Sequence, residues 1–333
     1  MNKLLIFLFL TFTVTVSIFG QVPNIETGVS KELAQWRAAN YSDIKFDLVI
    51  RLEKTSPMLT KIEKSSQKIK GTAVISLFNN GDLIILDWRK LRGKEDLSKI
   101  SNLRINERPA YFEEIGGHLI LKEGVLKNKY NTIRFDFITP VETGGAAMRY
   151  IDETDNSEFL YCVPNAENDL FPSFNQPDLK ARFQLTAVKP DSWKAEIITN
   201  SYGTTVQSFR LGESIYSFEE TEPMSANLFA FAAGEFAEFD CTGEACLRPP
   251  TSNNADANGQ EQAQPLRNSD VPMKFYVRRS QAGKFRKYES EVFRLNRKTA
   301  KSAKLDIILL PEILNIASDY DGIKFVPESA VFK

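Results

Sequence analysis

The chain has 333 residues, of which 42% are hydrophobic, and its 42 basic residues nearly balance its 43 acidic ones. A near-neutral chain has no global field that recruits nucleic acid or anionic lipid, so neither is expected as a partner. This length allows one large core or two smaller ones, and the 24 Phe and 10 Tyr, set mostly in alternating runs, favour a β-rich protein.

Residues 1–20 have the layout of a secretory signal peptide. Lys3 precedes an apolar run from Leu4 to Phe19, and Gly20 offers a small residue for cleavage. An uncleaved membrane anchor is the alternative, because the run is close to the lower limit for a span. We expect cleavage and export to the periplasm or the extracellular space, with no membrane span after cleavage.

Alternating runs dominate the next part of the chain. Residues 21–40 are expected to form a linker with a short helix over Lys31–Ala39, and residues 41–241 a β-domain built as a saddle or sandwich of antiparallel sheets. The turn Asn79–Asp82 joins two apolar runs, as a hairpin turn would. The residues expected to point inward are Ile44, Phe46, Leu48, Ile50, Leu52, Ile133, Phe135 and Phe137, and then Ala181, Phe183, Leu185 and Ala187.

The last third of the chain changes character. Residues 242–271 are polar and are predicted to form a flexible loop. Residues 272–280, with Met273–Arg278 as the strand itself, are expected to be the last strand of the β-domain, and residues 281–333 a short α/β fragment. Tyr288, Val292 and Leu295 recur there at helical spacing among many Lys and Arg. A solvated helix face explains this charge better than an anionic-ligand site, because no aromatic residues are interleaved with it.

The three cysteines fit export. Cys241 and Cys246 bracket T-G-E-A, a spacing that a local disulfide can close in an oxidising compartment. A zinc pair is the less favoured alternative, because no second Cys or His pair completes a tetrahedral set. Cys162 lies in an apolar strand context and is expected to be a buried structural thiol.

Familiar catalytic motifs are missing from the sequence. His118 is its single histidine, so an H-E-x-x-H zinc helix is excluded, and no G-x-S-x-G elbow supplies a nucleophile for a triad. No P-loop or G-x-G-x-x-G follows a strand, and no carboxylates are spaced as an acid–base pair. His118 follows Gly116-Gly117 and is expected at a hairpin edge. These residues alone predict no metal site and no catalytic set.

Two longer motifs resemble a known family. F-P-S-F-N-Q-P-D-L-K-A-R-F, Phe171–Phe183, resembles the F-P-C-F-D-x-P-x-x-K-A-x-F signature in the N-terminal β-domain of the aminopeptidase N-like zinc metallopeptidases, the gluzincin aminopeptidases. Asn175 stands where that family has Asp, and Ser173 where it has Cys. Phe218–Phe236 is similar to the family's x-x-T-x-P-M-S-T-Y-L-x-A-F-x-x-G-x-F. The resemblance implies removal of N-terminal residues from peptide substrates, with zinc as the cofactor of the full-length family.

The resemblance also implies a degenerate exopeptidase loop. Lys304–Glu312 is similar to the strand that leads into the family's G-A-M-E-N loop, which falls on residues 316–320. Only Ala317 matches that motif, and Asp319 stands for the glutamate that grips the free α-amine of the substrate. The substrate-binding residues implied in this way are Ala317, Ser318, Asp319, Tyr320 and Gly322. The family's Q-x-E pair, which also holds the peptide N-terminus, falls on Tyr161 and Val163, and neither can act as an anionic anchor.

A packing surface follows from the same resemblance. In the family, the stiff loop that begins at Phe171 lies against the catalytic domain and beside the substrate channel. With that domain or a partner protein missing, Phe171 and Phe174 are expected to form an exposed apolar patch together with Ile307, Leu309 and Leu310. Alternatively, Lys304–Lys333 folds back and covers this patch.

Three functions remain open at this point. The first is the N-terminal part of an exported aminopeptidase, inactive because the chain stops at Lys333, before the zinc helix. The second is a stand-alone, degenerate module that binds a peptide or a partner protein. The third is an enzyme of another class that uses unpaired carboxylates. An adjacent reading frame encoding H-E-x-x-H would favour the first, and an intact stop codon with no such frame the second.

Overall fold

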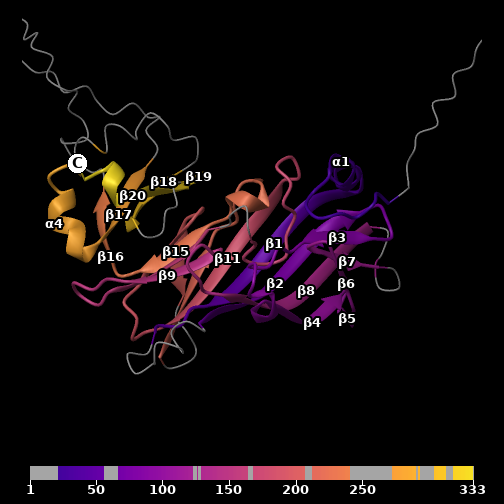
Figure 1. Cartoon of the computed structure of the whole chain (residues 1–333), viewed down its shortest axis with the longest axis horizontal. Coiled ribbons are helices and arrows are strands. Elements are labelled where there is room, and N and C mark those ends of the chain that lie inside the picture. Colours follow the sequence, from indigo (N-terminus) through magenta and orange to yellow (C-terminus); the bar gives the residue numbers. More distant parts are fainter. Residues whose placement is uncertain are drawn as a thin grey trace, which may run out of the picture.

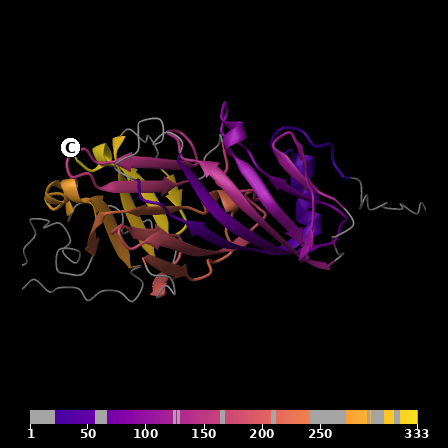
Figure 2. The same cartoon turned by 90° about the horizontal axis from the view of Figure 1, so that it is seen from below.

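The computed structural model describes residues 22–55, 67–122, 126, 129–163, 168–206, 212–240, 272–289, 292, 304–312 and 318–332. The molecule is elongated, with the N-terminal helix near one end and the C-terminal strands at the other (Figure 1), and the view turned by 90° agrees (Figure 2). Among the described helices, none is long and apolar enough to cross a membrane.

A long mixed sheet is the framework of the fold. Its strands, in spatial order, are β13 (Gly203–Val206), β14 (Glu213–Phe218), β11 (Ala181–Pro190), β1 (Tyr41–Arg51), β2 (Lys68–Asn79), β8 (Lys129–Pro140), β4 (Lys99–Ile105) and β5 (Arg108–Pro109). β1 and β11 run parallel, with Phe46 opposite Phe183, and the other neighbours are antiparallel. The expected mainly β fold is confirmed, and the parallel pair makes the sheet mixed rather than purely antiparallel.

Period-2 alternation decides which side chains of these strands are buried. The inward sets predicted for β1, β8 and β11 are all buried, whereas Val49, on the other face of β1, is 41% exposed. Apolar side chains on one face of a pleated strand can be buried together while their neighbours stay in water, so these strands cover a core with one face.

Two smaller sheets close this core. One contains β3 (Ile84–Asp87), β7 (His118–Leu121) and β6 (Glu113–Ile115), and the other contains β12 (Glu196–Thr199), β15 (Phe231–Gly234), β10 (Glu158–Cys162) and β9 (Ala147–Ile151). A single apolar cluster runs through the long sheet and both small ones. We call the part from β1 to β15 the β-domain.

The hairpin predicted at Asn79–Asp82 is wrong. The turn exists, because the Asn79 side chain bonds both the amide and the carbonyl of Gly81. However, β2 and β3 leave it for different sheets. Both edges of β2 are occupied by β1 and β8, while β3 is buried along its whole length and pairs with β7. Turn chemistry alone does not reveal that the two strands diverge.

The C-terminal strands form a sheet of their own. Its order is β16 (Phe236–Asp240), β17 (Met273–Arg278), β18 (Leu305–Leu310), β20 (Ile323–Pro327) and β19 (Ser318–Tyr320). The strand predicted at Met273–Arg278 is β17, and it lies between β16 and β18. We call these strands the C-terminal sheet. The predicted polar loop 242–271 and Leu295 fall outside the described residues.

Helices are short and few among the described residues. α1 (Lys31–Asn40) confirms the predicted N-terminal helix, and the Ser30 side chain caps it by accepting a hydrogen bond from the Leu33 amide at 3.1 Å. The others are α4 (Ala282–Phe285) and the 3-10 turns η1 (Glu95–Leu97), η2 (Ala226–Leu228), η3 (Arg279–Gln281) and η5 (Glu328–Ala330).

Replacing Phe46 tests where the core lies. Phe46 is fully buried, and its ring lies 4.8 Å from that of Phe183, measured between centroids. Phe46→Ala should lower the free energy of unfolding by about 3–5 kcal/mol, measured in denaturant, because it leaves a cavity in the core. Val49→Ala on the same strand is the control and should change it by less than about 0.5 kcal/mol. Equal losses from the two variants would contradict this core.

Candidate functional site

The loop Phe171–Asp178, here called the motif loop, packs into the β-domain. Phe171 is 5% exposed and Phe174 is 1% exposed. Their rings lie 6.0 and 6.2 Å from the Phe46 ring, between centroids. The expectation that these two side chains form an exposed patch is therefore wrong. Both rings pack into the core of their own domain, from a loop whose backbone is restrained by Pro172 and Pro177.

The other half of the expected patch is buried too. Ile307, Leu309 and Leu310 belong to β18, which has β17 on one side and β20 on the other. Ile307 and Leu309 pack in a cluster with Phe285 and Val331, and Leu310 packs toward the β-domain. Val331 comes from the C-terminal segment, so that segment helps to cover β18. The fold-back alternative is wrong for Phe171 and Phe174, because the core of the β-domain itself buries them.

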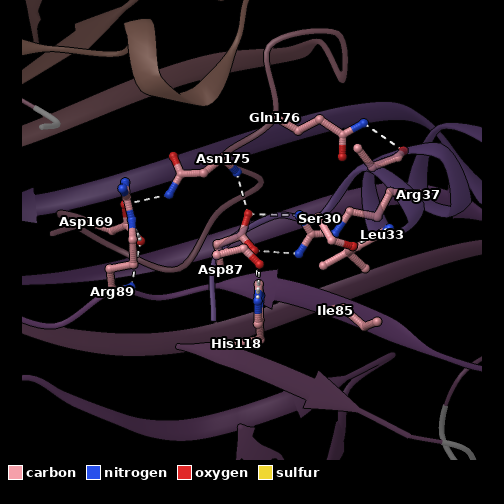
Figure 3. A network of polar contacts seen from close by, with 12 residues as sticks. Ser30, Leu33, Arg37, Ile85, Asp87, Arg89, His118, Asp169, Asn175 and Gln176 are labelled. Atoms are coloured by element: carbon pink, nitrogen blue, oxygen red, sulfur yellow. Dashed lines mark hydrogen bonds and ion pairs between the residues drawn. The ribbon is translucent and has the colours of Figure 1, made fainter. Parts of the chain in front are cut away.

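Asp87, the last residue of β3, holds the motif loop in place (Figure 3). Its carboxylate accepts two hydrogen bonds from Arg37 of α1, at 2.9 and 2.6 Å, and one from the Asn175 amide, at 2.6 Å. His118 Nδ1 lies 2.7 Å from the same carboxylate. The side-chain amide of Gln176 also donates to the Ala34 carbonyl of α1 at 2.9 Å. One buried carboxylate thus joins α1, β3, β7 and the motif loop.

Asn175 explains one departure from the family signature. Its side-chain amide donates to Asp169 Oδ1 at 2.6 Å, and Asp169 is also paired with Arg89 at 2.6 Å (Figure 3). An amide can donate this hydrogen bond, whereas an ionised aspartate only accepts. With Asp169 so close, position 175 in this chain suits Asn rather than the family's Asp.

The charges in this network are well defined. Burial alone would raise the pKa of Asp87, but His118 and Arg37 outweigh it and hold that pKa below its usual value. Burial alone would lower the pKa of His118, but the hydrogen bond and charge of Asp87 outweigh it and raise that pKa. These shifts favour an ionised Asp87 and keep His118 protonated to a higher pH than a free imidazole. His118 follows the turn of the β6–β7 hairpin, but the expectation of a hairpin-edge side chain is wrong. Its strand pairs with both β6 and β3, and the residue is 1% exposed.

The described part of the chain contains no zinc site. No group of three or more His, Cys, Asp or Glu side chains is arranged there to hold a metal ion. Both ring nitrogens of His118 are already engaged, Nδ1 by Asp87 and Nε2 by the carbonyls of Glu26 and Gly28. The described residues therefore do not fit the zinc of the resembled family.

A second apolar cluster joins the β-domain to the C-terminal sheet; we call it the inter-sheet junction. Tyr161 and Val163 enter it from β10 and the residue after it, and Tyr320 enters it from β19. The rings of Tyr161 and Tyr276 both contact Phe236, at centroid distances of 6.4 and 6.1 Å. Burial raises the pKa of Tyr161 well above its usual value, and its hydroxyl has no hydrogen-bond partner among the described residues.

Arg278 of β17 forms buried ion pairs at the same junction. It makes two hydrogen bonds to Glu328, at 2.7 and 2.5 Å, and one to Asp152 at 2.6 Å. Asp152 follows β9 of the β-domain, and it also accepts from the Ser280 hydroxyl at 2.5 Å. We call Arg278, Asp152 and Glu328 the Arg278 clamp. Its three side chains are buried, so each charge depends on the others.

The turn between β19 and β20 also rests on the β-domain. The side-chain amide of Asn200 donates to the Asp321 carbonyl at 2.7 Å. Gly322 follows with a φ of +77°, and a Cβ at this position would lie 2.4 Å from the Asn200 carbonyl oxygen. Only glycine tolerates both this backbone conformation and this close approach.

The predicted substrate-binding residues are brought together only in part. Tyr320 is buried in the inter-sheet junction and Gly322 forms the turn. Ser318 and Asp319 lie on β19, with Asp319 opposite Lys324, and Ala317 falls outside the described residues. Cys241 and Cys246, the disulfide candidates, fall outside them as well. Cys162 is a buried free thiol, as predicted.

Comparison with known proteins supports a distant peptidase relationship. Aminopeptidase N of Streptomyces lividans is 34% identical over 97 residues, which are 28% of this chain and 10% of that protein. Leucine aminopeptidase 2 of Neurospora crassa is 20% identical over 211 residues, which are 56% of this chain and 29% of that protein. The chain therefore covers less than a third of either relative. No family model matches it.

Breaking the Arg278 clamp should loosen the C-terminal sheet. Arg278→Met leaves two buried carboxylates without their cation, so the free energy of unfolding should fall by about 3–5 kcal/mol in a denaturant titration. Lys274→Met, on the same strand, is the matched control. Lys274 pairs with Glu238 and Asp240 in a partly exposed position, so its loss should cost less than about 1 kcal/mol. A clamp variant no less stable than the control would show that the clamp does not hold the junction.

Proposed function

We propose that this chain forms the peptide-side scaffold of an exported aminopeptidase N-like peptidase and that its 333 residues do not cleave peptides by themselves. In this proposal the β-domain and the C-terminal sheet provide one wall of a peptide-binding site. A zinc-bearing unit, encoded in continuation or separately, provides the other wall and the hydrolytic chemistry.

One observation carries the proposal. The resemblance assigns contacts with the peptide N-terminus to two segments far apart in sequence, one containing Tyr161 and Val163 and the other ending at Tyr320. These three residues pack in one cluster, the inter-sheet junction. Two chance motif matches would have no reason to meet in space. The partial similarity to two aminopeptidases points in the same direction.

The proposed site differs from that of the resembled family in the residues that hold the N-terminal ammonium group of the peptide. Tyr161 and Val163 are fully buried and uncharged, so they cannot hold an ammonium group. Asp319, on edge strand β19, is the acidic residue left in the predicted exopeptidase loop. In the proposal, Asp319 holds the free amine of the peptide in the assembled site.

An activity assay tests this function. The purified chain should not release nitroaniline from leucyl- or alanyl-p-nitroanilide, with or without added Zn²⁺, because the H-E-x-x-H zinc helix needs two histidines and the sequence has one. Mixing it with the polypeptide that carries H-E-x-x-H in the adjacent reading frame should produce hydrolysis. Chelator-sensitive hydrolysis by the chain alone would contradict the proposal. A genome without such a frame, together with no hydrolysis, would favour the stand-alone binding module.

The assembled activity also tests Asp319. Asp319→Asn should lower kcat/KM on the order of tenfold to a hundredfold, because a charge-assisted hydrogen bond contributes about 1.5–3 kcal/mol. Asp321→Asn removes the same charge from the same hairpin and should leave kcat/KM nearly unchanged. Equal effects from the two variants would mean that Asp319 has no special role.

A further inference from the structure

Both ring nitrogens of His118 face hydrogen-bond acceptors, so the observed contacts require the protonated ring. Nδ1 lies 2.7 Å from a carboxylate oxygen of Asp87, and Nε2 lies 2.9 Å from the carbonyl oxygens of both Glu26 and Gly28. Carboxylate and carbonyl oxygens only accept hydrogen bonds, and a neutral imidazole carries a single N–H. One ring nitrogen of a neutral His118 would face an acceptor with its lone pair. Only the imidazolium satisfies both sides.

The two carbonyls belong to residues 22–30, an irregular segment with a bend at residues 27–28 that leads into α1; we call this segment the strap. The strap lies against the turn of the β6–β7 hairpin. A Cβ on Gly116 would be 3.0–3.1 Å from the backbone of Glu26 and Thr27. The two bonds from Nε2 also tie the strap to the hairpin.

We propose that His118 is a pH-sensitive latch, which holds the strap on the β6–β7 hairpin while its imidazole is protonated and releases it when the proton leaves. The latch lies at the α1 end of the molecule, away from the C-terminal sheet (Figure 1). Release therefore changes the N-terminal segment and leaves the inter-sheet junction in place.

The charged groups around the latch decide its direction. Asp87 of β3 faces His118 directly, and Arg37 of α1 reaches it through that carboxylate. From the strap, the carbonyls of Glu26 and Gly28 contact His118, and the Glu26 carboxylate accepts from the Asn24 side chain. On β6, the residue opposite His118 is Ile115, and the neighbouring Glu114 pairs with Lys90. The motif loop contributes the Asn175 amide to Asp87, and Asp169 is paired with Arg89.

The pH dependence follows from these contacts. Burial and, to a smaller extent, the charge of Arg37 oppose the charge on His118, but the hydrogen bond and charge of Asp87 outweigh them, and the Gly28 carbonyl adds to the rise in pKa. A raised pKa means that the stabilisation is complete below the ordinary value of about 6.5 and is lost as the pH rises through the raised value. Each unit by which the closed strap raises that pKa corresponds to about a tenfold change in the opening equilibrium.

The single histidine makes a direct test possible. With any affinity tag removed, the ¹⁵N imidazole signals of the full chain belong to His118 alone. We expect the pKa of His118 to lie above the ordinary value of about 6.5. At pH values below that pKa, the chemical shifts should be those of a ring protonated on both nitrogens. Hydrogen exchange of strap amides, corrected for the intrinsic effect of pH, should rise about tenfold for each unit of strap-dependent shift. His118→Gln should make this corrected exchange independent of pH.

Two neighbouring glycines provide a matched pair that leaves His118 untouched. Both Gly116 and Gly117 have positive φ, so alanine strains the backbone at either position. Only Gly116→Ala pushes into the strap, since the nearest contact of a Cβ on Gly117 is Arg89 Cγ at 3.9 Å. Gly116→Ala should lower the His118 pKa and speed strap exchange, and Gly117→Ala should do neither. A neutral, singly protonated ring at pH 6, or corrected exchange that does not change with pH in the wild type, would overturn the latch.

Discussion

The buried carboxylate of Asp87 is the constraint on which the rest of the β-domain depends. An ionised carboxylate out of water costs several kcal/mol unless cations and donors surround it. Here they come from Arg37, His118 and the Asn175 amide, which belong to α1, β7 and the motif loop. Each of these elements is therefore held where it can satisfy the charge, and the aromatic rings of the motif loop fill the space beneath.

The contacts of Asp87 explain the structural role of the stiff motif loop. Its prolines, phenylalanines and amides serve the interior of the β-domain rather than an exposed docking surface. The contact with the C-terminal sheet is made elsewhere, by the inter-sheet junction, the Arg278 clamp and the hydrogen bond from Asn200 to Asp321. The peptide-side scaffold proposed here thus has two separate sets of contacts. The network around Asp87 stabilises the β-domain itself, and the inter-sheet junction with the Arg278 clamp binds the C-terminal sheet to it.

Local patterns predicted local structure well. Alternation found the inward faces of β1, β8 and β11, and α1 begins after its Ser30 cap. The network around Asp87 had no such signal, because its partners Arg37, His118 and Asn175 are 50, 31 and 88 residues away in sequence. The divergence of β2 and β3 and the Arg278 clamp were missed for the same reason. Long-range pairing of strands and charges is decided by tertiary packing, which short windows of sequence do not contain.

Amide hydrogen exchange in the motif loop tests the central role of Asp87 most directly. The Ser173 amide bonds the Asp87 carbonyl at 3.0 Å, and the Asn175 amide bonds its carboxylate at 2.6 Å. Measured by NMR, both amides should exchange as slowly as those of β1 and β8, and Asp87→Asn should speed Asn175 far more than the distant strands. Exchange of both wild-type amides at the rate of an unstructured peptide would contradict the claim that Asp87 holds the motif loop in place.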